Sequence, residues 1–154
     1  MKKYNVAVVG ATGMVGRKFL EVLTEKQLPV ENYYLFASAK SAGKTIDFMG
    51  KPHQIIELAE KNLEGKNIDI ALFSAGGDVS KEFAPIFAKH GILVIDNSSA
   101  WRRDENVPLV VPECNADDIK WHNNIIANPN CSTIQAMVVL KPLHEAFKIK
   151  RVIY

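Results

Sequence analysis

The sequence predicts an α/β fold, namely a Rossmann-like, doubly wound and mostly parallel sheet. Short apolar runs, which are typical of buried strands, alternate with amphipathic helical patterns along the 154 residues. A glycine-rich turn follows the first apolar run and opens the first helix, as in dinucleotide-binding βαβ units. With 47% hydrophobic and 23% charged residues, the composition is that of an ordinary globular chain with a sizeable core.

The first half of the chain contains strands separated by one helix. We predict a buried strand over residues 5–9, a helix over 14–26 whose apolar side chains share a face, and a second strand over 33–37. Residues 47–58 contain shorter strand-like pieces, for which an antiparallel edge excursion and a loop both stay open. A further apolar strand is predicted over residues 68–73.

The second half continues the alternation. A helix is predicted over residues 80–90, ended by Gly91, and is followed by a strand over 92–95. The remaining predictions are a loop over 97–108, a short strand over 109–111, a helical turn over 116–121, a strand over 125–127, a helix over 132–147 interrupted or kinked at Pro142, and a strand over 149–154.

Composition excludes several classes of function. The 19 basic and 17 acidic residues give a net charge of +2 that is spread along the chain, so we expect no nucleic-acid partner. No apolar run approaches the roughly 18 residues of a membrane span, and the first strand is too brief for a signal peptide, which favours a cytoplasmic protein without a membrane partner. The two cysteines lack metal-ligand spacing, so no metal site is predicted.

The turn Gly10-Ala11-Thr12-Gly13-Met14-Val15-Gly16 is the strongest binding motif. Its glycines let the backbone approach a pyrophosphate, whose charge then lies on free N–H groups at the helix start. The alternative is a glycine-rich turn that serves only tight strand–helix packing. A second glycine turn, residues 74–77, follows a later strand and either approaches the same ligand or is a plain tight turn.

The choice of dinucleotide follows from charge. An NAD-selective site usually ends its second strand in an acid that binds the ribose 2′-OH, and residues 37–44 contain no acid. The hydroxyls of Ser38 and Ser41 and the ammonium of Lys40 suit a 2′-phosphate, which favours NADP. The alternative is that the lysines of this stretch are merely solvated.

Two further segments carry reactive or anion-binding side chains. Cys131 lies where a strand ends and a helix starts, and free amides there, with the side chain of Asn130, could stabilise a thiolate and an oxyanion. An inert, half-buried cysteine is the alternative, and Cys114, without a helix start, is expected only to pack. Residues 96–103 end another strand with a polar loop that includes Arg102, either an anion-binding fork or a surface arginine.

Six segments in order, GATGMVG, ASAKSAGK, ALFSAGG, NSSAWR, PLVVPECN and NPNCST, resemble the aspartate-semialdehyde dehydrogenase family across nearly the whole chain. The resemblance implies NADPH-dependent reductive dephosphorylation of L-aspartyl 4-phosphate to L-aspartate 4-semialdehyde, on the route to lysine, threonine and methionine. Cys131 would attack the acyl phosphate to form a thioester, Asn130 would orient or stabilise the intermediate, and Arg102 would hold the substrate phosphate. The implied cofactor contacts are Gly10, Thr12, Gly13, Met14 and Val15 at the pyrophosphate, Ser38, Lys40 and Ser41 at the 2′-phosphate, and Ser74, Ala75 and Gly76 beside the nicotinamide.

The sequence stops inside an apolar, β-branched run, which suggests a chain truncated before a second catalytic and dimerisation domain. We expect residues 1–130 to be the NADP-binding, Rossmann-like domain and residues 131–154 to begin the second domain. By resemblance, that domain supplies a histidine, a glutamine and most of the interface of a homodimer or homotetramer, so the fragment alone should be inactive. Alternatives are a related acyl-phosphate reductase, such as N-acetylglutamyl-phosphate reductase, and a non-catalytic dinucleotide-binding module.

Overall fold

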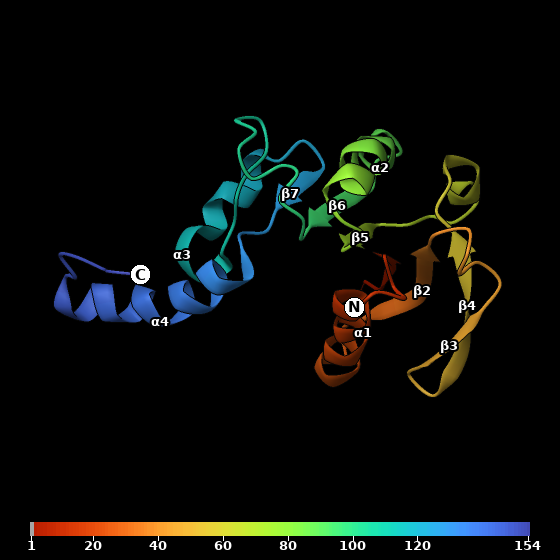
Figure 1. Ribbon diagram of the computed structural model, residues 1–154, viewed down its shortest axis with the longest axis horizontal. Coiled ribbons are helices and arrows are strands. Elements are labelled where there is room, and N and C mark those ends of the chain that lie inside the picture. Colours follow the sequence, from red (N-terminus) through yellow and green to blue (C-terminus); the bar gives the residue numbers. More distant parts are fainter. Residues whose placement is uncertain (1) are drawn as a thin grey trace.

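The computed structural model, which describes residues 2–154, contains one seven-stranded sheet with helices on both faces (Figure 1). The strand order is β3-β4-β2-β1-β5-β6-β7, and every neighbouring pair is parallel except β3 and β4. The strands are β1 (Tyr4–Val9), β2 (Val30–Ala37), β3 (Thr45–Phe48), β4 (Lys51–Glu57), β5 (Ile70–Phe73), β6 (Leu93–Asp96) and β7 (Ile125–Ala127). The predicted α/β class with a mostly parallel sheet is confirmed.

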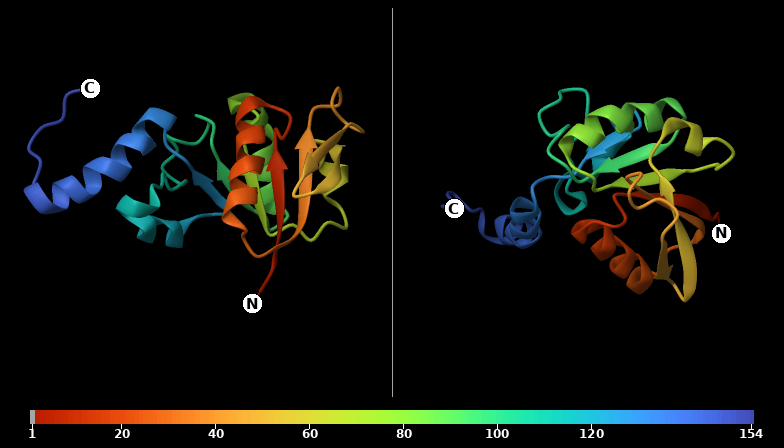
Figure 2. Two further views of the ribbon diagram at one scale, coloured as in Figure 1. Left: turned by 90° about the horizontal axis from the view of Figure 1, so that it is seen from below. Right: turned by 45° about the vertical axis from the view of Figure 1, so that its right-hand side comes forward.

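The helices divide between the two faces of the sheet, as the view on the right of Figure 2 shows for α1 and α2. They are α1 (Met14–Lys26), α2 (Gly77–Lys89), α3 (Pro112–Asn115) and α4 (Cys131–Phe147), with 3₁₀ turns η1 (Glu60–Leu63) and η2 (Ala116–Trp121). Strand side chains alternate between faces, so Val8 of β1 joins the cluster under α1 whereas Ala7 and Val9 join the cluster under α2. Residues 6–9 of β1 are buried on both faces of the sheet, which is why they form a continuous apolar run.

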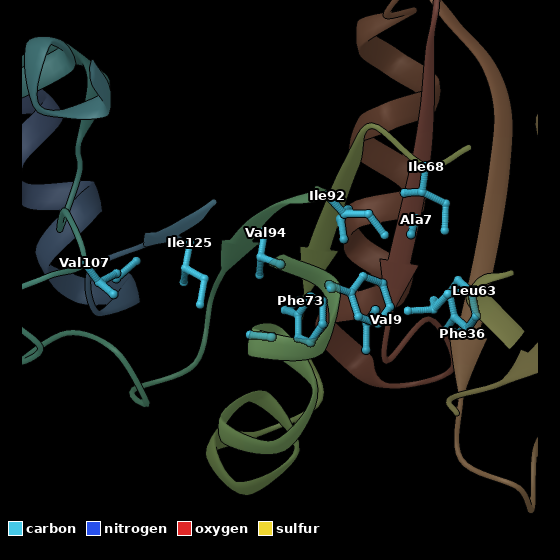
Figure 3. Close-up of a cluster of buried hydrophobic side chains, with 14 residues drawn as sticks. Ala7, Val9, Phe36, Leu63, Ile68, Phe73, Ile92, Val94, Val107 and Ile125 are labelled. Carbon is cyan, nitrogen blue, oxygen red and sulfur yellow. The ribbon is translucent and has the colours of Figure 1, made fainter. Parts of the chain in front are cut away.

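The larger cluster fixes α2 against the sheet (Figure 3). Phe87 of α2 meets Phe73 of β5 with ring centroids 5.0 Å apart and Phe36 of β2 at 5.9 Å, both edge to face. All three rings are fully buried. Edge-to-face pairs add roughly 0.5–1.5 kcal/mol to the burial of each ring, so this trio holds the last turn of α2 against the sheet.

Most predicted elements are confirmed, and α1 and β7 have the predicted bounds. Helix α2 begins three residues before the predicted position because it continues into the glycine turn at residues 74–77. The open question at residues 47–58 resolves as an antiparallel hairpin, β3–β4, which joins the sheet edge through β4. Its two turn residues, Met49 and Gly50, both have positive φ (51° and 72°), as a type I′ turn requires.

Two predicted strands are wrong. Residues 109–111 form only an isolated bridge, Leu109 to Ala127, before α3 begins. Residues 149–154 have no regular structure, because a strand needs a neighbour for its backbone groups and none of the described residues pairs with this segment. Helix α4 continues through Pro142 and leads away from the sheet (Figures 1 and 2). Among residues 2–154, no helix is long and apolar enough to cross a membrane.

Candidate functional site

A pocket of about 460 Å³ opens at the carboxyl edge of the sheet, beside β1. In an open parallel sheet, ligands bind at the carboxyl ends of the strands, at the point where the strand order reverses. Here β2 lies on one side of β1 and β5 lies on the other. The wall of the pocket combines the two glycine turns, the end of β2, and parts of α2: Gly10, Thr12, Gly13, Ala37, Ser38, Leu58, Ser74, Ala75, Val79 and Phe83. The structure therefore brings six of the predicted cofactor residues together, namely Gly10, Thr12, Gly13, Ser38, Ser74 and Ala75.

The turn between β1 and α1, together with the first turn of α1, has room only for glycine at two positions. Gly10 has a φ of +85°, and a Cβ there would collide with the backbone oxygen of Ser74. A Cβ on Gly16 would collide with the backbone oxygen of Gly10. The Gly13 N–H donates to the Gly10 oxygen at 2.9 Å and closes the turn. Because Gly10, Thr12 and Gly13 line the pocket, the backbone of this turn is available there to a pyrophosphate.

The predicted 2′-phosphate side chains lie on a turn after β2. The Ser41 N–H donates to the Ser38 oxygen at 2.9 Å, and the Gly43 N–H donates to the Ile55 oxygen of β4 at 2.9 Å. Ser38 lines the pocket, whereas Lys40 is exposed and outside its wall. Backbone hydrogen bonds therefore hold the turn in place, and the exposed ammonium group of Lys40 could reach a ligand at the mouth of the pocket.

Four residues of the wall were missed by sequence reasoning: Ala37 at the end of β2 and three with large apolar side chains. Val79 and Phe83 are one helical turn apart on α2, and Leu58 follows β4. The spacing of four along α2 was visible in the sequence, but only the fold shows that Val79 and Phe83 line a ligand pocket. These side chains give the pocket an apolar wall opposite the polar turns.

Other predicted cofactor residues lie outside the wall. Met14 is 89% exposed and Val15 42% exposed at the start of α1, where backbone N–H groups have no acceptor within the helix. Ser41 is half-buried on its turn, and Gly76, with a φ of +91°, is the residue before α2. None of these four residues lines the pocket.

Cys131 is exposed as the first residue of α4. Asn130 caps the helix because its side-chain oxygen accepts from the Ser132 N–H at 3.0 Å. That carbonyl oxygen is thereby engaged, which leaves the amide nitrogen of Asn130 as the group that could stabilise an anion. First-turn amides have no acceptor within their own helix, so those of Cys131 and Thr133 are also suited to an oxyanion.

Arg102 is held by the carboxyl ends of two strands. Its Nε donates to the Asn128 oxygen at 2.9 Å, and its Nη2 donates to the Asn97 oxygen at 3.1 Å. Nε and Nη2 share one edge of the planar guanidinium, so the edge formed by Nη1 and Nη2 is left for a bidentate anion. Since Asn128 lies three residues before Cys131, Arg102 is anchored to the same turn that leads to the thiol.

Cys114 lies in a different environment. It is half-buried between α3 and α4, with its sulfur 4.0 Å from the Met137 oxygen, and lines a largely apolar pocket of about 430 Å³ with Lys141 and His144. This packing position agrees with the role predicted for it. Over residues 2–154, no group of three or more His, Cys, Asp or Glu side chains is arranged to hold a metal ion.

Comparison with known proteins gives consistent matches. The model of the semialdehyde dehydrogenase NAD-binding domain matches residues 5–122. Aspartate-semialdehyde dehydrogenase of Aquifex aeolicus is 58% identical over 152 residues, which are 97% of this chain and 44% of that protein. The Campylobacter jejuni protein of the same name is 54% identical over 98% of this chain and 45% of its own length. This chain thus spans less than half the length of these relatives.

Solved structures agree. Aspartate semialdehyde dehydrogenase II of Vibrio cholerae, complexed with ASA, aligns with a TM-score of 0.88 and 49% identity over 94% of this chain and 47% of that chain. Aspartate semialdehyde dehydrogenase of Candida albicans with NADP aligns with a TM-score of 0.78 and 29% identity, over 95% of this chain and 48% of that one.

Proposed function

The chain belongs to the semialdehyde dehydrogenase family, and from this premise we propose that it is the cofactor-binding part of an NADP-dependent aspartate-semialdehyde dehydrogenase. The whole protein would reduce L-aspartyl 4-phosphate to L-aspartate 4-semialdehyde, with release of phosphate, in the biosynthesis of lysine, threonine and methionine. One observation carries the proposal: an exposed cysteine begins α4 at the same edge of the sheet as the dinucleotide pocket.

The residues fit a dinucleotide. Gly10 and Gly16 allow the glycine turn to pack closely against the Ser74 turn and α1, and the amides at the start of α1 are available to a pyrophosphate. Leu58, Val79 and Phe83 offer an apolar wall to a flat ring. When bound, the nicotinamide supplies the hydride. Ser38, Ser41 and Lys40 would hold the 2′-phosphate, and a charge-assisted contact of this kind contributes roughly 1.5–3 kcal/mol.

Cys131, Asn130 and Arg102 would each have a separate role in the reaction. The sulfur of Cys131 forms a bond to the acyl carbon, and the bond from that carbon to the phosphate oxygen breaks, so phosphate leaves with the electron pair. After reduction of the thioester carbon, the bond from that carbon to the Cys131 sulfur would break, so that the thiolate leaves and the aldehyde is formed. First-turn amides of α4 and the amide nitrogen of Asn130 stabilise the oxyanion, and the free edge of Arg102 holds the phosphate.

Residues 131–154 would begin a second domain of the whole protein. No residue of α4 is buried, although the helix is 17 residues long, and it leads away from the sheet (Figure 1). The second domain would complete the active site and the interface of a homodimer or homotetramer, and the 154 residues alone would be inactive. Light scattering and an activity assay on the full-length protein and on this chain would test both statements.

The deciding experiment measures NADPH oxidation by the full-length protein with each of two acyl phosphates. Turnover with L-aspartyl 4-phosphate supports the proposal, whereas turnover with only N-acetylglutamyl phosphate assigns the chain to that reductase. Cys131→Ser should abolish turnover and leave NADPH binding intact. Binding of NADPH without turnover of either substrate would instead indicate a non-catalytic dinucleotide-binding module.

Two matched variants test the binding roles. Arg102→Ala should raise the KM for the acyl phosphate and leave the KM for NADPH unchanged, whereas Arg103→Ala, at an exposed neighbouring position, should change neither. Titration calorimetry should show that NADP binds about tenfold or more tightly than NAD, and that Lys40→Glu removes the preference. An equal affinity in the unmodified protein would refute the assignment of NADP.

A further inference from the structure

The carboxyl ends of β6 and β7 are joined by a side-chain hydrogen bond. Asn97 directly follows β6 and Asn128 directly follows β7, and the Asn128 Nδ2 donates to the Asn97 Oδ1 at 2.6 Å. Both side chains are half-buried. The backbone pairing also continues past the strands, because the Asn97 N–H donates to the Phe73 oxygen at 3.0 Å and the Asn128 N–H to the Asp96 oxygen at 2.8 Å.

Arg102 forms hydrogen bonds with both Asn97 and Asn128. Its Nε and Nη2 donate to the backbone oxygens of the same two asparagines, at 2.9 Å and 3.1 Å. The separation of those two oxygens sets the direction of the guanidinium plane, because both N–H groups project from one rigid edge. A change in the distance between Asn97 and Asn128 would therefore rotate the free edge of Arg102.

We propose that Asn97 and Asn128 are positioning residues that orient Arg102 toward an anion held near Cys131. The inference rests on the proposed function, since it assigns the bound anion as the phosphate of the substrate. Asn128 is three residues from Cys131 in a turn that contains the buried Pro129, so the asparagine pair also fixes the origin of that turn relative to Arg102. The pair acts through Arg102 and does not itself hold the anion.

The loop that carries Arg102 is also held by hydrogen bonds that do not involve Asn97 or Asn128 side chains. A role of the two asparagines in positioning Arg102 can therefore be distinguished from a role in folding the loop. The Ser98 Oγ donates to Asp96 Oδ2 at 2.6 Å, and the Trp101 Nε1 donates to the Oγ of Ser80, a buried residue of α2, at 2.9 Å. Because these bonds and the ladder bonds do not involve the asparagine side chains, removal of the Asn97–Asn128 bond should leave the loop folded. Arg102 alone should lose its orientation.

The test uses the full-length protein and inorganic phosphate as the probe, with calorimetric titration as a readout that needs no turnover. Asn97→Ala and Asn128→Ala should each weaken phosphate binding by roughly two- to tenfold, the range expected for loss of one neutral hydrogen bond. The double variant should be no weaker than either single variant, because the second substitution finds the bond already broken. In an Arg102→Ala background, neither substitution should have a further effect.

A matched control exists near the amino-terminal ends of β1 and β2, at the opposite end of the parallel strands. Asn32 of β2 donates its Nδ2 to the Oδ1 of Asn5 of β1 at 2.9 Å, so Asn32→Ala breaks the same kind of bond between neighbouring strands. This variant should bind phosphate like the unmodified protein. NADP affinity and the urea midpoint of unfolding should be similar in the Asn32 and Asn128 variants.

The outcomes separate the two proposals. Unchanged phosphate affinity in the Asn97 and Asn128 variants overturns the positioning role, whether or not the protein turns over aspartyl phosphate. Additive losses, or losses that persist in the Arg102→Ala background, overturn it as well, because the pair would then act without Arg102. Phosphate binding that depends on the pair, in a protein that does not turn over aspartyl phosphate, supports the positioning role and refutes only the proposed substrate.

Discussion

Replacement of Gly16 by alanine has two opposite effects on the free energy of unfolding: a gain in helix propensity and a steric clash with the β1–α1 turn. Gly16 lies within α1, where alanine is favoured over glycine by about 1 kcal/mol. The added Cβ, however, would overlap the Gly10 oxygen and lie 2.8 Å from the Gly10 carbonyl carbon and 2.9 Å from the Ala11 Cα. All of these are backbone atoms of a closed turn, so no side chain can rotate away.

The clash should prevail. Overpacking of a rigid site costs typically 1–3 kcal/mol, and here the helix must move away from β1 to relieve it. We expect Gly16→Ala to lower the free energy of unfolding by up to about 2 kcal/mol after the gain in helix propensity is subtracted. The same displacement opens the pyrophosphate cradle, so NADP affinity should fall as well.

Urea denaturation of the 154-residue chain measures the first effect and calorimetric titration the second. Gly77→Ala is the control, because it also adds a Cβ to a helical glycine but the nearest atom is the Ser99 Oγ at 3.9 Å. Its stability should be unchanged or slightly higher. A Gly16→Ala chain as stable as the Gly77→Ala chain would refute the steric argument.

Three further predictions concern thiols, a buried phenol and a helix cap. At neutral pH, Cys131 should react with iodoacetamide faster than the half-buried Cys114, and preferential labelling of Cys114 in a mass-spectrometric time course would contradict this. Burial raises the pKa of Tyr33 above its usual 10.0, and its buried OH lacks a partner among the described residues, so Tyr33→Phe should stabilise the chain by about 1 kcal/mol. The advantage should grow as the pH rises above 10.0, where only the unfolded phenol of the unmodified chain ionises, and thermal melts over that range would show it. Asn130→Ala should reduce helix stability by about 1 kcal/mol through loss of the bond to the Ser132 N–H, seen in circular dichroism, whereas Asn130→Asp should retain it.

The elements that could be predicted from sequence are those whose signals are local. Strand β1, the glycine turn and α1 follow one another within residues 4–26, and periodicity and glycine spacing were sufficient to place them. The strand predicted over 149–154 was wrong, because apolar, β-branched composition indicates what can form a strand but not whether a neighbour is present to pair with it.

Some residues of the candidate site could likewise be predicted from local sequence signals, and others could not. Gly10, Ser38 and Ser74 lie at ends of neighbouring strands, so their meeting in one pocket followed from the predicted sheet. Leu58 and Phe83 could not be assigned to it, because their approach depends on how α2 and β4 pack. The bond between Asn97 and Asn128 joins positions 31 residues apart, and nothing in either local sequence indicates it.

The lengths of the outermost strands limit how this sheet can be extended. One edge is β3, which has four residues, and the other is β7, which has three and is flanked by the Leu109 bridge. A strand from another molecule would gain only a few backbone hydrogen bonds at either edge, too few to repay the ordering of an extended segment. Copies of the 154-residue chain should therefore not join through continuous sheets, and peptides that recognise targets by adding a strand should not bind at these two edges.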